Sequence, residues 1–274
     1  MKTLYLDIFS GISGDMFIGA LIDLGVDAHQ LGRELGKLKL DGYHLHVSRQ
    51  HKSAIEGVKF DVHLADAHDH HHGHGHEHHH EDDHEHGHEH HHEHEHDDHH
   101  HDDQRTFTQI KKLITGSKLS PWVKRKAVAV FQRIAVAEGK IHGLPPEKVH
   151  FHEVGAVDSI VDIVGACIGL EMLGKPRVLA APVTEGTGWV KCAHGRFPIP
   201  APATLAILGA RRIGITQCDE PHELVTPTGA ALLAEFVESF APMRGLVAEK
   251  IGFGLGTRDN KTRPNVLRAV LGRS

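Results

Sequence analysis

The sequence predicts an α/β fold, in which one or two mixed sheets carry flanking helices and a long, disordered His-rich insertion interrupts the chain. Apolar strand-like runs alternate with amphipathic helical stretches through residues 1–66 and 105–274. The residues between these ranges show neither period. We therefore expect residues 1–66 to form the first part of an α/β domain, residues 67–104 to be the insertion, and residues 105–274 to complete the domain.

The first strand is predicted over residues 3–9, and an amphipathic helix begins a few residues later. A Gly/Ser-containing loop joins them, and such a loop before a helix is typical of a phosphate cradle. The predicted phosphate contacts are Ser10, Gly11, Ser13 and Gly14. Two alternatives stay open: Asp7 and Asp15 bind a metal, or Ser13 simply caps the helix.

Residues 27–38 indicate a second helix, and residues 43–50 and 55–64 alternate as the two strands of an antiparallel hairpin do. His44 and His46 fall on one face of the first strand. Ordinary surface histidines are the favoured interpretation, and a metal role is the alternative.

The insertion is dominated by histidine. Residues 68–101 contain 20 histidines interleaved with Asp and Glu, and residues 68–103 contain no Lys or Arg. No core can form without apolar residues, so disorder is expected. Dense imidazole favours Ni²⁺, Cu²⁺ and Zn²⁺ in many exchangeable sites. The tract includes the histidine triplets His70, His71, His72, His78, His79, His80, His90, His91 and His92.

A short helix is predicted over residues 107–114, and a long one from Ser120, the N-cap, and Pro121 to about residue 142. Residues 149–162 then concentrate ionisable side chains between a strand-like run and an apolar helix ending near Gly174. His150 and His152 are expected on one side of a strand, and Asp158 and Asp162 on one helix face.

This cluster suits either a divalent metal or acid–base chemistry. We interpret His150, His152 and Glu153 as candidate general bases and Asp158 as a candidate metal ligand. The alternative is ordinary strand and helix-surface residues.

Residues 178–183 and 212–217 are predicted strands, and residues 203–208 a helix. Between them, Cys192 and His194 alternate onto one face and form a candidate soft metal pair. Arg196 is a candidate phosphate contact. A further helix is expected over residues 230–240, with Thr226 or Thr228 at its start. A glycine-alternating turn is expected over residues 252–259, and a last strand over residues 265–271.

Composition narrows the functional classes. Without residues 68–103 the chain carries a net charge of +7, which favours an anionic small molecule as the ligand. The sequence lacks the dense basic patches that are typical of nucleic-acid-binding proteins. We expect no signal peptide and no membrane span. Three cysteines without CxxC spacing predict a reduced, cytoplasmic protein.

Several motifs together resemble the nickel insertion protein family of the lactate racemase cofactor pathway (LarC). They are Leu6-Asp-Ile-Phe-Ser-Gly-Ile-Ser-Gly-Asp-Met16, His150-Phe-His-Glu-Val-Gly-Ala-Val-Asp-Ser159, Cys192-Ala-His-Gly195, Glu223-Leu-Val-Thr-Pro-Thr-Gly229 and Gly252-Phe-Gly254. The His-rich insertion also lies where this family carries one. The resemblance covers essentially the whole chain.

The resemblance implies a lyase-type, CTP-dependent cyclometallase. Its substrate would be pyridinium-3,5-bisthiocarboxylic acid mononucleotide. Ni²⁺ would be placed between a ring carbon and two sulfur atoms, giving the nickel-pincer nucleotide that lactate racemase receives. CTP would be hydrolysed to CMP and pyrophosphate with Mg²⁺ or Mn²⁺.

Members of the family continue into a C-terminal, CTP-binding domain, whereas this sequence ends at Ser274. We therefore expect a separate C-terminal half as a possible partner. Two other functions stay open: a nickel store or metallochaperone acting through the tract, and a metal-dependent hydrolase of a phosphate ester.

Overall fold

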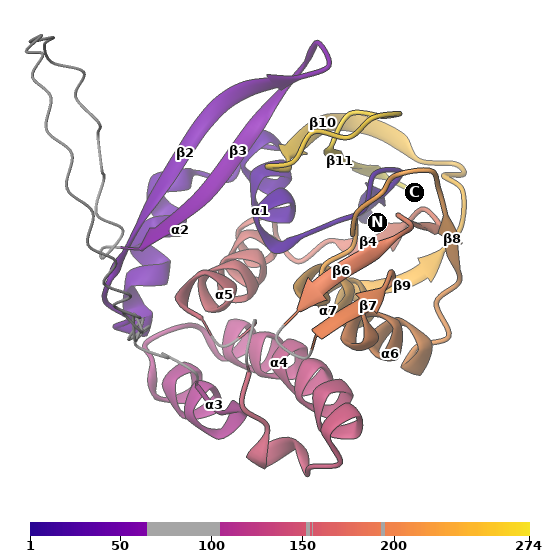
Figure 1. The fold of residues 1–274 in the computed structure, drawn as a ribbon. Coiled ribbons are helices and arrows are strands. Elements are labelled where there is room, and N and C mark those ends of the chain that lie inside the picture. Colours follow the sequence, from indigo (N-terminus) through magenta and orange to yellow (C-terminus); the bar gives the residue numbers. More distant parts are fainter. Residues whose placement is uncertain (65–104, 152–153, 155, 193–194) are drawn as a thin grey trace, which may run out of the picture.

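A computed structural model describes residues 1–64, 105–151, 154, 156–192 and 195–274 (Figure 1). Its main element is a mixed seven-stranded sheet, so the predicted α/β class with a mixed sheet is confirmed. The strand order is β2-β3-β10-β11-β1-β4-β9, and two small two-stranded sheets, β5-β8 and β6-β7, accompany it. The predicted disorder of the insertion concerns residues outside the described ranges.

The elements follow the predicted alternation of helix and strand. The strands are β1 (Lys2–Asp7), β2 (Tyr43–Lys52), β3 (Ile55–Leu64), β4 (Arg177–Ala180), β5 (Val183–Glu185), β6 (Trp189–Cys192), β7 (Gly195–Pro198), β8 (Ile215–Gln217), β9 (Val237–Phe240), β10 (Val247–Leu255) and β11 (Val266–Arg273). The helices are α1 (Gly14–Asp23), α2 (Ala28–Leu35), α3 (Phe107–Gly116), α4 (Pro121–His142), α5 (Val157–Met172), α6 (Pro202–Ala210) and α7 (Pro227–Phe236), with short 3₁₀ turns η1 (Gly36–Leu38) and η2 (Pro146–Lys148).

Strand pairing is partly antiparallel and partly parallel. β1 runs antiparallel to β11 and parallel to β4, and β4 runs parallel to β9. β2 and β3 form the predicted antiparallel hairpin, and β3 joins the sheet by a short parallel pairing to β10. Figure 1 shows this hairpin extending beyond the rest of the sheet, and the two termini lie close together, with the Met1 amino group 3.0 Å from the Ser274 carbonyl oxygen.

The helices build a second layer against the sheet. α1 lies against β3 and β10, α5 packs on α1 and α2, and α4 packs on α5, α6 and α7. α5 is buried along most of its length, which agrees with its nearly uninterrupted apolar sequence. Ser120 caps α4 by accepting a hydrogen bond from the Val123 N–H at 3.1 Å, and Pro121 occupies the first helical position, as predicted.

The predicted glycine-alternating turn at residues 252–259 is wrong for residues 252–255, which belong to strand β10, whereas residues 256–259 form the loop that follows it. The glycines allow α1 to approach this strand closely. A Cβ atom added at Gly254 would lie 1.7 Å from the Met16 carbonyl oxygen, and one added at Gly252 would lie 2.6 Å from that of Ala20. The alternation of glycine therefore marks helix-to-sheet packing rather than a turn.

Two further local predictions are corrected. The helix expected over residues 230–240 ends at Phe236, and residues 237–240 pair with β4 as β9. The strand expected around His150 is only an isolated bridge between Thr106 and His150. In both places a pairing partner distant in sequence decides the backbone conformation, which local periodicity does not report.

Within the described ranges, no helix is long and apolar enough to cross a membrane. The three cysteines are free, and Cys167 lies buried on α5 as predicted. Burial raises the pKa of its thiol, so this side chain belongs to the core.

Candidate functional site

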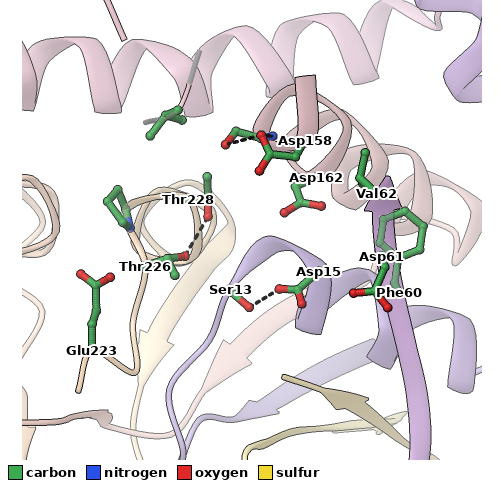
Figure 2. A pocket seen from close by; sticks show the side chains of 13 residues that line it. Ser13, Asp15, Phe60, Asp61, Val62, Asp158, Asp162, Glu223, Thr226 and Thr228 are labelled. Carbon is green, nitrogen blue, oxygen red and sulfur yellow. Dashed lines mark hydrogen bonds between the residues drawn. The ribbon is translucent and has the colours of Figure 1, made fainter. Parts of the chain in front are cut away.

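Three helices begin at one cavity of about 370 Å³ (Figure 2). The N-terminal residues of α1, α5 and α7 line it, and β3 closes one side. The lining residues are Ser13, Asp15, Phe60, Asp61, Val62, Val154, Asp158, Ser159, Asp162, Glu223, Thr226, Pro227 and Thr228. The positive ends of three helix dipoles therefore converge on one space.

Glycines at the helix starts make this convergence possible. A Cβ atom added at Gly14 would lie 2.6 Å from the Cβ of Asp162, so the first turn of α1 touches α5 directly. One added at Gly229 would lie 2.1 Å from the Ile12 carbonyl oxygen, which brings α7 against the loop before α1. Larger residues at either position would separate the helices.

The cavity wall is strongly acidic. Asp15, Asp158 and Asp162 surround the same space in Figure 2, and Asp61 and Glu223 also contribute carboxyl groups. The Lys59 ammonium group lies behind this wall, 2.9 Å from Asp15 Oδ2 and 2.6 Å from Asp61 Oδ1. Such a wall attracts a divalent cation.

Lys59 is almost completely buried and stays charged. Burial by itself would lower the pKa of its side chain, but the carboxylates of Asp15 and Asp61 raise it above the usual value for lysine. Asp15 is further held by the Ser13 hydroxyl, which donates a hydrogen bond to it. Lys59 and Ser13 thus fix Asp15 at the cavity rim.

Asp162 lies in the cavity wall between Asp158 and Asp15 (Figure 2). Its Oδ1 atom is buried and has no hydrogen-bond partner among the described residues. Burial raises the pKa of its carboxyl group well above the usual value for aspartate, and the charges of Asp15 and Asp158 raise it further. Lys59 and the backbone N–H of Asp15 act in the opposite direction. Asp162 therefore holds a proton more readily than an ordinary aspartate does.

A second cavity of about 200 Å³ adjoins the first and shares four of its lining residues: Ser13, Asp15, Glu223 and Thr226. It adds Arg258 and Asn265, together with the backbone at Gly256 and Thr257. Of the described residues that line the two cavities, only Arg258 is cationic. We call the two cavities together the bipolar site, because carboxyl groups line the first and Arg258 lines the second.

Two buried glutamates hold the loop between these cavities. Glu185 Oε1 accepts hydrogen bonds from the N–H groups of Leu224, Val225 and Gly186 at 2.7, 3.3 and 2.7 Å. Burial raises the pKa of Glu185, although these N–H groups oppose the shift. Glu220 accepts bonds from the backbone N–H groups of Lys261 and Thr262. Both side chains fix residues 220–226 in the position that starts α7.

The predicted phosphate loop divides between the cavity and the protein interior. Ser13 lines both cavities, whereas Ser10 is buried and accepts a hydrogen bond from the Asn260 side chain at 3.0 Å. Gly11 packs against Leu224, with a φ of +79° and its N–H bonded to the Ile8 carbonyl oxygen. Gly14 faces Asp162.

The other predicted ligands lie in several places. Asp15 and Asp158 line the first cavity, whereas Asp7 forms an ion pair with Arg268 at the end of β1. Cys192 ends β6 and donates a hydrogen bond to the Gly195 carbonyl oxygen at 3.4 Å. Arg196 lies over the Trp189 ring at 5.3 Å and is not among the residues lining either cavity.

Of the candidate bases, only His150 is described. It is exposed, between the buried Val149 and Phe151, and does not line the cavity. His152, Glu153, His194 and the tract histidines, from His70 to His92, lie outside the described residues. Val154, which follows His152 and Glu153 in sequence, does line the cavity.

Within the described ranges, no three His, Cys, Asp or Glu side chains are already arranged around one metal position. The sequence did not identify Asp61, Lys59 or Glu223 as site residues. Lys59 left a signal, because it interrupts the apolar run Val58–Phe60 at a position the sheet buries. Asp162 was expected on the face of Asp158, and the structure places both in the cavity wall.

Comparison with known proteins identifies relatives of this chain. The chain is 47% identical over 273 residues to the pyridinium-3,5-bisthiocarboxylic acid mononucleotide nickel insertion protein of Lactiplantibacillus plantarum, covering 99% of this chain and 61% of that protein. The protein of the same name from Geobacillus kaustophilus is 45% identical over 274 residues, covering 99% and 60%. No solved structure matches the chain.

The chain thus spans about 60% of the length of these curated relatives. The family model described as nickel insertion protein matches residues 4–274, and with it the loop before α1, the start of α5 and the start of α7. On this match and these identities, the chain belongs to the nickel insertion protein family.

Proposed function

We propose that this chain inserts Ni²⁺ into pyridinium-3,5-bisthiocarboxylic acid mononucleotide, the compound named in its relatives, as part of a CTP-dependent, lyase-type cyclometallase. The product is the nickel-pincer nucleotide cofactor, which lactate racemase receives. CTP binds with Mg²⁺ or Mn²⁺ on a C-terminal part of the kind that the family resemblance implies. The bipolar site carries the proposal, because the substrates are a divalent cation and an anionic nucleotide.

In this assignment, nickel enters the acidic cavity. Carboxylate oxygens of Asp158, Asp162 and Asp15 hold it weakly, since nickel prefers nitrogen and sulfur donors to oxygen. Weak, exchangeable ligands suit a cargo that must leave for the two sulfur atoms of the substrate. The incomplete set of preassembled ligands fits the same role, because the substrate itself supplies the remaining donors.

The nucleotide phosphate takes the other end. Arg258 lines that end, and the start of α7 at Thr226 offers a hydroxyl group and a helix N-terminus. The pyridinium ring then spans the shared residues and presents its sulfur atoms to the acidic cavity. This orientation keeps the phosphate away from Asp158 and Asp162, which line only the first cavity.

Formation of the nickel–carbon bond replaces a ring proton, so a base must accept that proton. His152 and Glu153 remain the proposed bases, because they immediately precede Val154 of the cavity wall. His150 is a weaker candidate, since it is exposed away from the lining. The proposed location is the cytoplasm, where a free thiol such as Cys192 stays reduced.

Asp158→Asn tests the cavity assignment. Asp158 is exposed and lines the cavity, and among the described residues it accepts hydrogen bonds only from the adjacent Ser159, so the change leaves the fold intact. We expect at least a tenfold loss of apo-racemase activation, on the order of 1.4 kcal/mol, when the chain is mixed with substrate, Ni²⁺, CTP and the C-terminal part.

Glu147→Gln is the matched control, because Glu147 is an exposed acid outside both cavities. It should leave the yield of cofactor unchanged. Equal yields from the wild-type chain and Asp158→Asn at limiting nickel would remove the acidic cavity from the reaction.

A further inference from the structure

Three exposed imidazoles gather on the β2–β3 hairpin. His44 of β2 pairs directly with His63 of β3, so both side chains project from the same face. His46 is two residues from His44 and therefore shares that face. The ring centroids of His44 and His63 lie 5.0 Å apart, and those of His46 and His63 lie 5.8 Å apart.

These separations match those of imidazoles sharing one metal ion. With a metal–nitrogen distance of about 2.1 Å, each ring centroid lies roughly 3 Å from the ion, so two tetrahedral ligands have centroids about 5 Å apart. The three rings are not yet aimed at a common point. Because all three are exposed, rotation of their side chains can aim them without disturbing the strand pairing.

We propose that His44, His46 and His63 form a binding site for a borderline divalent transition-metal ion, of which Ni²⁺ is the relevant one in this family. Backbone pairing presents two of the ligands directly opposite each other, which lowers the ordering cost of binding. An all-imidazole site selects such ions over Mg²⁺ and Ca²⁺.

The short distance between this site and the acidic cavity suggests a role in delivering nickel to the cavity. His46 pairs directly with Asp61, and Asp61 lines the cavity. The His44–His63 pair lies two residues further along the strands, about 7 Å away. An ion on the hairpin is thus one short step from the cavity. A staging role for nickel rests on the proposed function, whereas binding itself does not.

Hydrogen exchange of the full-length chain tests the binding without any turnover. NiCl₂ at about 100 times its dissociation constant should slow exchange through hairpin opening by up to roughly 100-fold in peptides from β2 and β3. The slowing should disappear in the variant His44→Gln/His46→Gln/His63→Gln. MgCl₂ should leave exchange of the wild-type chain unchanged.

His51→Gln is the matched control, because His51 is an exposed histidine of the same strand whose β3 partner is Glu56. It should behave as wild type. Circular dichroism checks that the triple variant is folded, and a nickel-edge anomalous map of wild-type crystals should place an ion about 2.1 Å from the imidazole nitrogens. Equal nickel-induced slowing in the wild type and the triple variant, or an anomalous map with no ion on the hairpin, would overturn the site.

Discussion

Asp162 illustrates how one side chain sets the chemistry of the cavity. It packs directly on Gly14, which has no side chain to keep the two helices apart. Its Oδ1 atom has no hydrogen-bond partner in the described part of the chain, and Asp15 and Asp158 lie nearby. A carboxyl group is poorly solvated in such a place unless a proton or a cation neutralises it. An ionised carboxylate at this position is therefore expected to weaken the stability of the fold.

Asp162→Asn should remove this weakness. Because the pKa of the folded-state carboxyl is raised, the wild type loses stability as pH rises from the unfolded value of about 3.9 toward the folded one. The variant lacks this loss. We expect its free energy of unfolding in urea to exceed that of wild type at pH 8, and to do so by less at pH 5.

Asp219→Asn is the control for this comparison, since Asp219 is exposed and should show no such pH-dependent gain. A loss of stability of equal size at both pH values in Asp162→Asn would show that the ionised carboxylate, with its partners, stabilises the fold.

At the scale of elements, the site depends on how closely α1, α5 and α7 approach the sheet and one another. α1 lies on β3 and β10 at backbone distance because Gly19, Gly252 and Gly254 carry no side chains. The position of its N-terminus, and so of Ser13 and Asp15, follows from this packing.

Gly254→Ala should push α1 away from β10. The added methyl group would lie 1.7 Å from the Met16 carbonyl oxygen, so the helix must shift. We expect a loss of about 3 kcal/mol or more in the free energy of unfolding. Gly116→Ala has no atom within 4 Å of the added group and should leave stability unchanged or slightly raised. Thermal unfolding of both variants makes the comparison, and equal melting temperatures would rule out the packing argument.

Glu185→Ala tests the support of α7. The substitution leaves the three N–H groups of Leu224, Val225 and Gly186 without their acceptor, which should cost about 3 kcal/mol. Glu185→Gln keeps a carbonyl acceptor and should cost less. Denaturant unfolding measures both, and a glutamine variant as unstable as the alanine variant would mean that the negative charge, not the acceptor, holds the loop.

On the scale of the whole molecule, the candidate metal ligands are of two kinds. The acidic cavity is lined by a few carboxylates from elements far apart in the chain, whereas residues 68–101 hold 20 histidines in one run. Many weak sites on one segment would raise the local concentration of nickel. A nickel store would need only the tract, and an insertion enzyme needs the cavity as well.

Replacing the histidines of residues 68–101 by serine separates these functions. We expect cofactor formation to stay near the wild-type level at saturating Ni²⁺ and to fall several-fold when nickel is scarce, because local enrichment is lost. The yield of cofactor across a nickel titration gives the answer. A protein that worked only as a store would lose its function at every nickel concentration.

The sequence by itself determined the α/β class, the hairpin of β2 and β3, and the start of α4 at Ser120 and Pro121. These features depend on local periodicity and capping, which neighbouring residues encode. The motif combination also identified the family. The sequence also predicted Asp15 and Asp158 as metal ligands and Asp162 as a residue on the same helix face as Asp158. It did not predict that the start of α1, with Asp15, lies beside the start of α5.

Only the tertiary structure decided that α1, α5 and α7 begin at one cavity, that Lys59 and Asp61 belong to it, and that Arg258 lies on its far side. It also turned Gly252 and Gly254 from a predicted turn into a strand. In each case the deciding contact joins residues far apart in the chain. Close packing between backbones and the pairing of buried charges depend on which distant segments come together in the folded chain. The spacing of residues along the sequence does not predict these contacts.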